Sequence, residues 1–154
     1  MLKYCLDKWD ENKNLLKDKL KTVDLNRCEY LDLVRLVVDY ILNPGESKYG
    51  KWNSKEITVV DNGDYQGTQL FLFHANSYQP CEWDYLMTYV GYGSCSGCDT
   101  LLAIQGWDDK PVTEKQVKDF MALCKDLVTN IVKPYNGGWR HREGFDEVTI
   151  DEER

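Results

Sequence analysis

The first 45 residues show the apolar periodicity of two helices. Residues 3–21 and 26–42 both place apolar side chains at intervals of three and four, which gives each helix one apolar face. These faces consist of Leu6, Trp9, Leu16, Leu20, Leu31, Val34, Val38 and Ile41. Asn26 and Glu29 have the spacing of a capping box at the start of the second helix, and Asn43-Pro44-Gly45 is expected to end it.

The middle of the chain changes to short runs that are rich in β-branched and aromatic residues. Residues 56–60, 68–74 and 84–92 are predicted strands. The first two are joined by the turn sequence of residues 61–67, and the link before the third contains Pro80. Consecutive short strands with short links predict an antiparallel meander.

The helical period returns after the strands. Residues 98–105 are expected to form a short helix with Asp99 as its N-cap. Thr113 and Gln116 form a capping box that opens a longer helix, which Pro134 ends. Its apolar face consists of Val117, Phe120, Cys124, Leu127, Val128 and Ile131.

The predicted fold class is therefore α+β: a small antiparallel meander packed against N-terminal and C-terminal helices. A length of 154 residues fits a single domain, to which we assign residues 1–143. Residues 144–154 form an acidic tail with five acids, either frayed or contributing residues 147–150 as a fourth, edge strand.

Charge is distributed unevenly along the chain. The net charge is -7, and no Lys or Arg occurs between Glu56 and Asp109, a stretch that also holds nine aromatic residues. This argues against direct nucleic-acid binding, which requires a basic surface, and favours a protein partner with a basic surface. The chain has no apolar run that could span a membrane and no signal-peptide pattern at its start, so a cytoplasmic location is expected.

Cys95-Ser96-Gly97-Cys98 is the most distinctive motif, and it allows three interpretations. It could supply half of a zinc site, form a redox dithiol, or pack in a tight loop; Cys28 and Cys124 are expected to be core residues. A zinc site would need two more ligands, and His74 and Cys81 belong at the other end of a third strand about 30 Å long. Asp99 beside Cys98 would raise a thiol pKa rather than lower it, so packing is favoured and no cofactor is assigned.

The meander nevertheless predicts one candidate binding site. The turn at residues 61–67 lies at the end of the sheet to which the third strand delivers Cys95, so residues from both segments should be neighbours. The candidate site consists of Asp61, Asp64, Tyr65, Cys95, Ser96, Gly97, Cys98 and Asp99. Backbone N–H groups of the Gly-rich loop at residues 91–97 could also hold a small anion. No combination of residues typical of catalysis is found, and we favour a protein that is not an enzyme.

Two runs in this region, Gly63-Asp64-Tyr65-Gln66-Gly67-Thr68 and residues 93–100 (GSCSGCDT), resemble a group of small uncharacterised proteins of tailed bacteriophages. The resemblance covers about the central third of the chain, and no known activity comes with it. It implies a phage-encoded accessory protein in the host cytoplasm that binds a host or phage macromolecule, as host-takeover and anti-defence proteins do. A metal or thiol-redox protein centred on Cys95 and Cys98 and a small-anion binder are the alternatives.

Overall fold

The computed structural model describes residues 1–47, 51–63, 66–77, 79–94, 99–106, 111–135 and 147–149. Its helical elements are α1 (Leu2–Leu20), α2 (Tyr30–Val37), the π-helix η1 (Val38–Leu42), the 3-10 helix η2 (Glu82–Asp84), α3 (Thr100–Ile104) and α4 (Glu114–Thr129). Its strands are β1 (Thr58–Asp61), β2 (Gly67–His74), β3 (Tyr85–Tyr92), β4 (Lys133–Tyr135) and β5 (Glu147–Thr149). The fold class is α+β, as the hydrophobic pattern predicts.

Strands β1, β2 and β3 form the antiparallel sheet, in that order. The register pairs Asp61 with Gln69 and Gly67 with Tyr92 at one end of the sheet, and His74 with Tyr85 at the other. This is the predicted meander. β1 runs over Thr58–Asp61 rather than residues 56–60, and the Asn53 side chain accepts the backbone N–H groups of residues 55 and 56 instead.

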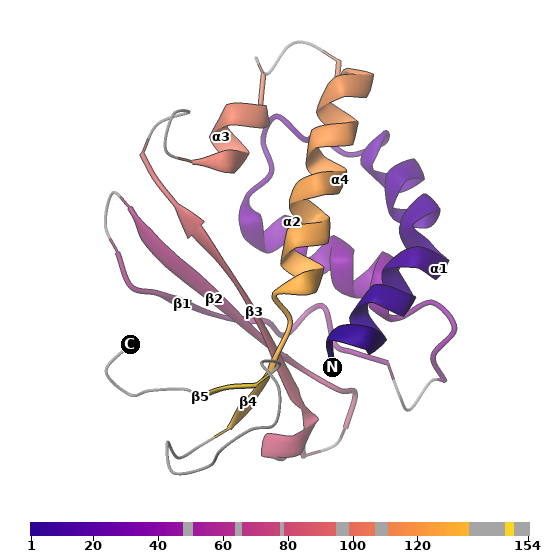
Figure 1. Cartoon of the computed structure of the whole chain (residues 1–154), viewed down its shortest axis with the longest axis vertical. Coiled ribbons are helices and arrows are strands. Elements are labelled where there is room, and N and C mark those ends of the chain that lie inside the picture. The colour runs from indigo at the N-terminus through magenta and orange to yellow at the C-terminus, as the bar shows by residue number, and fades with distance from the viewer. Residues whose placement is uncertain are drawn as a thin grey trace.

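The helices gather on one side of the three-stranded sheet, and α4 runs between α1 and the sheet in the view of Figure 1. α1 and α4 run in opposite directions, so the end of α1 lies beside the start of α4 (Figure 1). One apolar core joins these helices to the inner face of the sheet, and its fully buried members include Leu16, Leu33, Ile41, Phe71, Phe73, Leu86, Phe120 and Leu127. Among the described residues, no helix has the length and apolar character needed to cross a membrane.

The second helix begins later than the sequence predicts. Glu29 is the N-cap of α2, and its backbone N–H donates to the Asp32 carboxylate at 2.8 Å. The predicted capping box at Asn26 is therefore wrong by one helical turn. The Asn26 side chain instead accepts hydrogen bonds from the Gly106 N–H at 2.8 Å and from Gln116 Nε2 at 3.0 Å. Tertiary contacts thus use Asn26 to join the loop before α2 to α3 and α4.

The π-helix that follows α2 was not predicted. The Asn43 N–H donates to the Val38 carbonyl five residues earlier at 3.0 Å, and the buried Asn12 side chain donates to the Ile41 carbonyl at 2.8 Å. The segment ends at Asn43-Pro44-Gly45 as expected, and Gly45 adopts a φ of 84°, which favours glycine.

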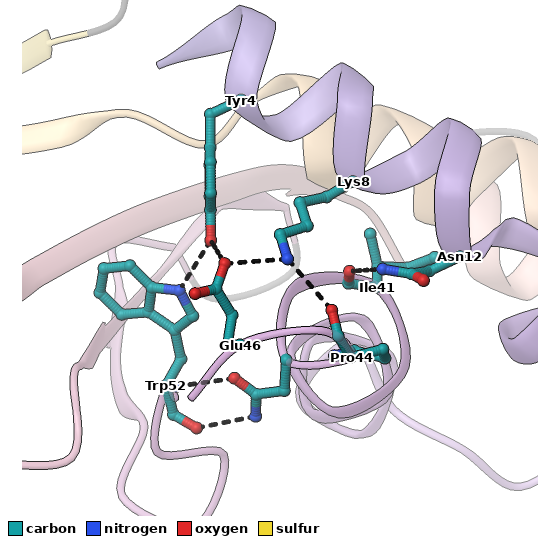
Figure 2. Close-up of polar contacts among 8 residues, drawn as sticks. Tyr4, Lys8, Asn12, Ile41, Pro44, Glu46 and Trp52 are labelled. Atoms are coloured by element: carbon teal, nitrogen blue, oxygen red, sulfur yellow. Dashed lines mark hydrogen bonds and ion pairs between the residues drawn. The ribbon is translucent and has the colours of Figure 1, made fainter. Parts of the chain in front are cut away.

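A polar cluster fastens the start of α1 to the chain that leaves η1 (Figure 2). Lys8 Nζ lies 2.8 Å from the Glu46 carboxylate and donates to the Pro44 carbonyl at 3.0 Å. The Tyr4 hydroxyl donates to Glu46 at 3.2 Å and accepts from Trp52 Nε1 at 3.3 Å. The hydrogen bond with Lys8 lowers the pKa of Glu46, and burial raises the pKa of Tyr4 to about 12. Every polar group named here is paired within the cluster. The cluster therefore has a structural role, which is to hold the start of α1 against the chain that follows η1.

The Thr113–Gln116 capping box of α4 is confirmed, with hydrogen bonds of 3.0 and 3.1 Å. The helix ends at Thr129, so the predicted end at Pro134 is wrong: the backbones of Val132 and Met87 exchange hydrogen bonds of 2.8 and 2.9 Å, an isolated bridge to β3 that takes the chain out of the helix. The buried Thr88 hydroxyl donates to the Leu127 carbonyl at 2.6 Å, which ties β3 to α4. β4 pairs in parallel with β5, a contact that the pattern did not predict.

Candidate functional site

Two members of the predicted site, Asp61 and Asp99, belong to the described part of the chain. The other six, Asp64, Tyr65, Cys95, Ser96, Gly97 and Cys98, lie outside the described residues. The site is therefore built here from Asp61, Asp99 and the residues that surround them.

Asp61 ends β1 with a carboxylate that accepts three hydrogen bonds. The donors are the Tyr92 hydroxyl at 2.5 Å, the Gly63 N–H at 3.0 Å and Gln69 Nε2 at 3.2 Å. The bonds from Tyr92 and from Gly63 lower the pKa of Asp61. The Asp61 side chain therefore holds a fixed negative charge at this exposed end of the sheet.

Asp99 is buried, and its carboxylate accepts hydrogen bonds from Gly93 after β3, from α3 and from Tyr30. Oδ1 accepts from the Leu102 N–H at 3.1 Å, as the predicted N-cap should, and also from the Tyr30 hydroxyl at 2.7 Å. Oδ2 accepts from the Gly93 N–H at 2.9 Å. Burial raises the pKa of Tyr30, and its hydroxyl oxygen also accepts the Leu101 N–H at 3.1 Å.

The end of β3 connects these two carboxylates. Tyr92 reaches Asp61 through its hydroxyl, and the next residue, Gly93, reaches Asp99 through its N–H. The structure thus brings Asp61 and Asp99 to the same end of the sheet. The Gly93 N–H, which the anion-binding hypothesis would use, already donates to the Asp99 carboxylate.

A hollow of about 520 Å³ lies beside this end of the sheet, between the start of α2, α3 and the inner face of β1 and β2. Its lining includes Val59, Phe71, Leu31 and Leu102 as apolar groups, together with Gln69, Tyr92, Glu29 and Asp99. We call it the β1 hollow. Val59 and Leu102 are 40% and 42% exposed, which is high for large apolar side chains. Sequence reasoning missed the hollow because Leu31 and Leu102 come from separate helices with no local pattern that links them to β1.

β1 is an edge strand of the sheet and borders the hollow. The Asn62 N–H donates to the Thr68 carbonyl at 3.2 Å, and hydrogen-bonded pairs recur at every second residue of an antiparallel ladder. Thr58 and Val60 therefore bond toward β2, whereas the N–H and C=O groups of Val59 and Asp61 point to the free edge. Among the described residues, no backbone group bonds to that edge.

Three of the described cysteines, Cys5, Cys28 and Cys124, are buried packing residues. Cys28 and Cys124 are buried, as predicted, and burial raises the pKa of Cys28 to about 11 and that of Cys124 further. Cys81 is exposed and donates to Asp84 at 3.4 Å, while His74 Nε2 lies 3.0 Å from the Glu56 carboxylate. Within the described ranges, no group of three His, Cys, Asp or Glu side chains could hold a metal ion. The zinc and redox hypotheses at Cys95 and Cys98 fall outside these ranges and stay predictions.

Comparisons of the chain with protein-family models, with curated proteins and with solved structures find no match. The function is therefore argued from the site itself.

Proposed function

We propose that this protein acts by binding a partner protein, and that it takes up an extended segment of the partner along the free edge of β1. One observation carries the proposal: the outward N–H and C=O groups of Val59 and Asp61 lie beside the β1 hollow, whose lining includes partly exposed apolar side chains. An added strand would form main-chain hydrogen bonds with this edge and place alternate side chains in the hollow.

The sequence of β1 supports this use. Natural edge strands are commonly protected by short length, Lys, Pro or an inward-pointing charge; β1 is short, but Thr58-Val59-Val60 carries no Lys, Pro or charge, and the one charge of the strand, Asp61, stands at its end. The edge therefore offers a short, apolar template. Because β1 contains only four residues, an added strand would be short, and the apolar contacts in the hollow would supply much of the affinity.

Charge indicates which partner fits. Asp61 lies at the end of the strand and Glu29 in the lining of the hollow, whereas Arg27, the single basic residue in the described lining, lies 3.5 Å from Asp24. The stretch from Glu56 to Asp109 contains no Lys or Arg. The proposed partner segment is thus extended and alternates apolar residues with Lys or Arg.

This function agrees with the interpretation drawn from the resemblance to tailed-bacteriophage proteins. In that interpretation the protein is a phage-encoded accessory factor that binds a host or phage protein in the host cytoplasm. Strand addition to an edge needs no catalytic group, and we propose a binding role without enzymatic activity.

The test uses peptides as the probe. The immobilised protein is exposed to a display library of random decapeptides, and we expect the enriched peptides to alternate apolar and basic residues. Amide hydrogen exchange with the best synthetic peptide should then show protection at Val59 and Asp61.

The decisive variant is Val59→Pro. Proline removes an N–H that points away from β2, so the ladder of the sheet is kept while the free edge is blocked. Peptide binding should be lost, whereas Val59→Ile, which keeps the N–H and the apolar side chain, should retain most of it. The urea midpoint of each variant checks that the fold survives. Equal binding by Val59→Pro and the parent protein, or a library that yields no enriched pattern, would reject the proposal.

A further inference from the structure

A second hollow, on the helical side of the molecule, carries the opposite charge. It has a volume of about 1020 Å³ and lies between the second half of α1 and the start of α4. Five lysines line it: Lys13, Lys17, Lys21, Lys115 and Lys118. Glu114 is the single acid in its described lining, although the whole chain has a net charge of -7. We call it the lysine groove.

The lysines form two rims. Lys13 and Lys17 on α1 and Lys21 at its C-cap follow one another at intervals of four, so their Cβ atoms are about 5–6 Å apart and the row is about 12 Å long. Lys115 and Lys118 line the same hollow from the first turns of α4, which lie beside the end of α1 because the two helices run in opposite directions (Figure 1). Val112, Val117 and Met121 supply apolar surface between the rims.

Internal ion pairs neutralise the rims only in part. Lys13, Lys21 and Lys115 lie 4.0, 3.8 and 3.4 Å from Asp10, Asp18 and Asp119, and all three pairs are exposed. Exposed pairs of this kind contribute little and are readily exchanged. Within the described part of the chain, Lys17 and Lys118 have no acidic side chain within ion-pair distance, so each can take a carboxylate from outside.

We propose that the lysine groove binds an acidic amphipathic helix of a partner protein. Such a helix would pack its apolar face against Val112, Val117 and Met121 and direct Glu or Asp side chains to the lysines on both flanks. A helix that lies in a groove between two others is a common mode of peptide recognition. This site does not depend on the β1 edge, and the two surfaces take partners of opposite charge.

The observations favour a helix over a nucleic acid. The described lining holds no aromatic side chain on which a base could stack, although such stacking is a main source of affinity for single strands. A duplex would also place a long row of phosphates on a surface that is acidic overall, whereas two turns of a helix match the 12 Å row of lysines.

The experiment measures the fluorescence anisotropy of a labelled 14-residue peptide titrated with the full-length protein. The peptide has Leu at helical spacing on one face and Glu on both flanks. The same composition in scrambled order and a 12-nucleotide single strand serve as comparison probes. We expect the amphipathic peptide to bind more tightly than either, with affinity that falls as salt is raised.

The groove is tested by Lys17→Glu/Lys118→Glu, which reverses the two lysines that form no ion pair with any described residue. This double variant should weaken peptide binding by about tenfold or more. The matched control, Lys3→Glu/Lys55→Glu, makes the same charge change outside the groove and should alter binding by less than about twofold. Urea midpoints confirm folding. Equal loss in both double variants, equal binding of the scrambled peptide, or tighter binding of the oligonucleotide would each overturn the proposal.

Discussion

Replacement of Asp99 by Asn tests whether the Asp99 carboxylate is structural or is available to a ligand. In the structure both Asp99 oxygens are engaged, Oδ1 by Leu102 and Tyr30 and Oδ2 by Gly93. Asparagine keeps one acceptor oxygen but presents an amide N–H₂ at the other position. If its oxygen keeps the bonds from Leu102 and Tyr30, the amide faces the Gly93 N–H, and two donors then oppose each other.

The expected loss of stability follows from the broken hydrogen bond with Gly93 and from the burial of the Asp99 side chain. Asp99 is 7% exposed, so a donor that loses its carboxylate acceptor there has little access to water. Loss of one hydrogen bond to a charged acceptor should lower the free energy of unfolding by about 1.5–3 kcal/mol. Asp99→Ala should cost more, because it also removes the N-cap of α3, which contributes about 1 kcal/mol on its own.

Urea denaturation at neutral pH measures both variants, with Tyr30→Phe as a third. Tyr30→Phe removes the donor to Asp99 and the acceptor of the Leu101 N–H, so about 1–3 kcal/mol should be lost. The Tyr30→Phe/Asp99→Ala double variant should lose less than the sum, since both single changes break the same bond. Parent-like stability of Asp99→Asn and Asp99→Ala would refute this reasoning, and the carboxylate would then be free to serve a ligand.

Three further predictions concern stability. Thr88→Val leaves the buried Leu127 carbonyl without its donor at 2.6 Å and should cost about 1–3 kcal/mol in urea unfolding, whereas Thr88→Ser, which keeps the hydroxyl, should restore the bond. Phe120→Ala empties a fully buried position and should cost about 3–5 kcal/mol by the same measurement; a loss below about 1 kcal/mol would contradict the packing. The stability that the polar cluster of Figure 2 contributes should change with pH at both the acid and the alkaline extreme. The raised pKa of Tyr4, about 12, gives a contribution that is complete below pH 10 and lost as the pH rises from 10 to 12. The lowered pKa of Glu46 gives one that is present above its ordinary pKa of 4.5 and lost as the pH falls below it. Urea midpoints across pH should show the alkaline change absent from Tyr4→Phe and the acid change absent from Glu46→Gln; parent-like profiles would contradict the assignment.

The sequence predicted the sheet well because strand period and link length fix which ends of a meander meet. That reasoning placed Asp61 and Asp99 at one end of the sheet and His74 at the other, and the described residues lie there. Local spacing was less informative where two overlapping patterns compete. Asn26 and Glu29, and Glu29 and Asp32, are both spaced as capping boxes, and the long-range bonds of Asn26 to Gly106 and Gln116 decide between them.

Both candidate surfaces required the tertiary structure. Lys13, Lys17 and Lys21 show a spacing of four in the sequence, but the groove exists only because Lys115 and Lys118 line it from a helix about 100 residues away along the chain. The β1 hollow similarly combines side chains from α2, α3 and the sheet. Periodicity describes which face of an element is apolar, and it does not say which elements come together.

The π-helix at Val38–Leu42 marks the one turn at which this helical segment can lose a residue. A π turn holds one residue more than an α turn, so η1 behaves as a one-residue insertion that the fold has absorbed without forming a loop. Deletion of the exposed Asp39 would return this turn to the α-helical count and leave the later residues of the helix on their present faces. Asn43, whose side chain exchanges hydrogen bonds of 2.7 and 2.9 Å with the Trp52 backbone, would keep that contact. A deletion in the regular turns of α2 would instead rotate every later residue by about 100°, so homologues of this chain should change the length of this helix only at the π turn.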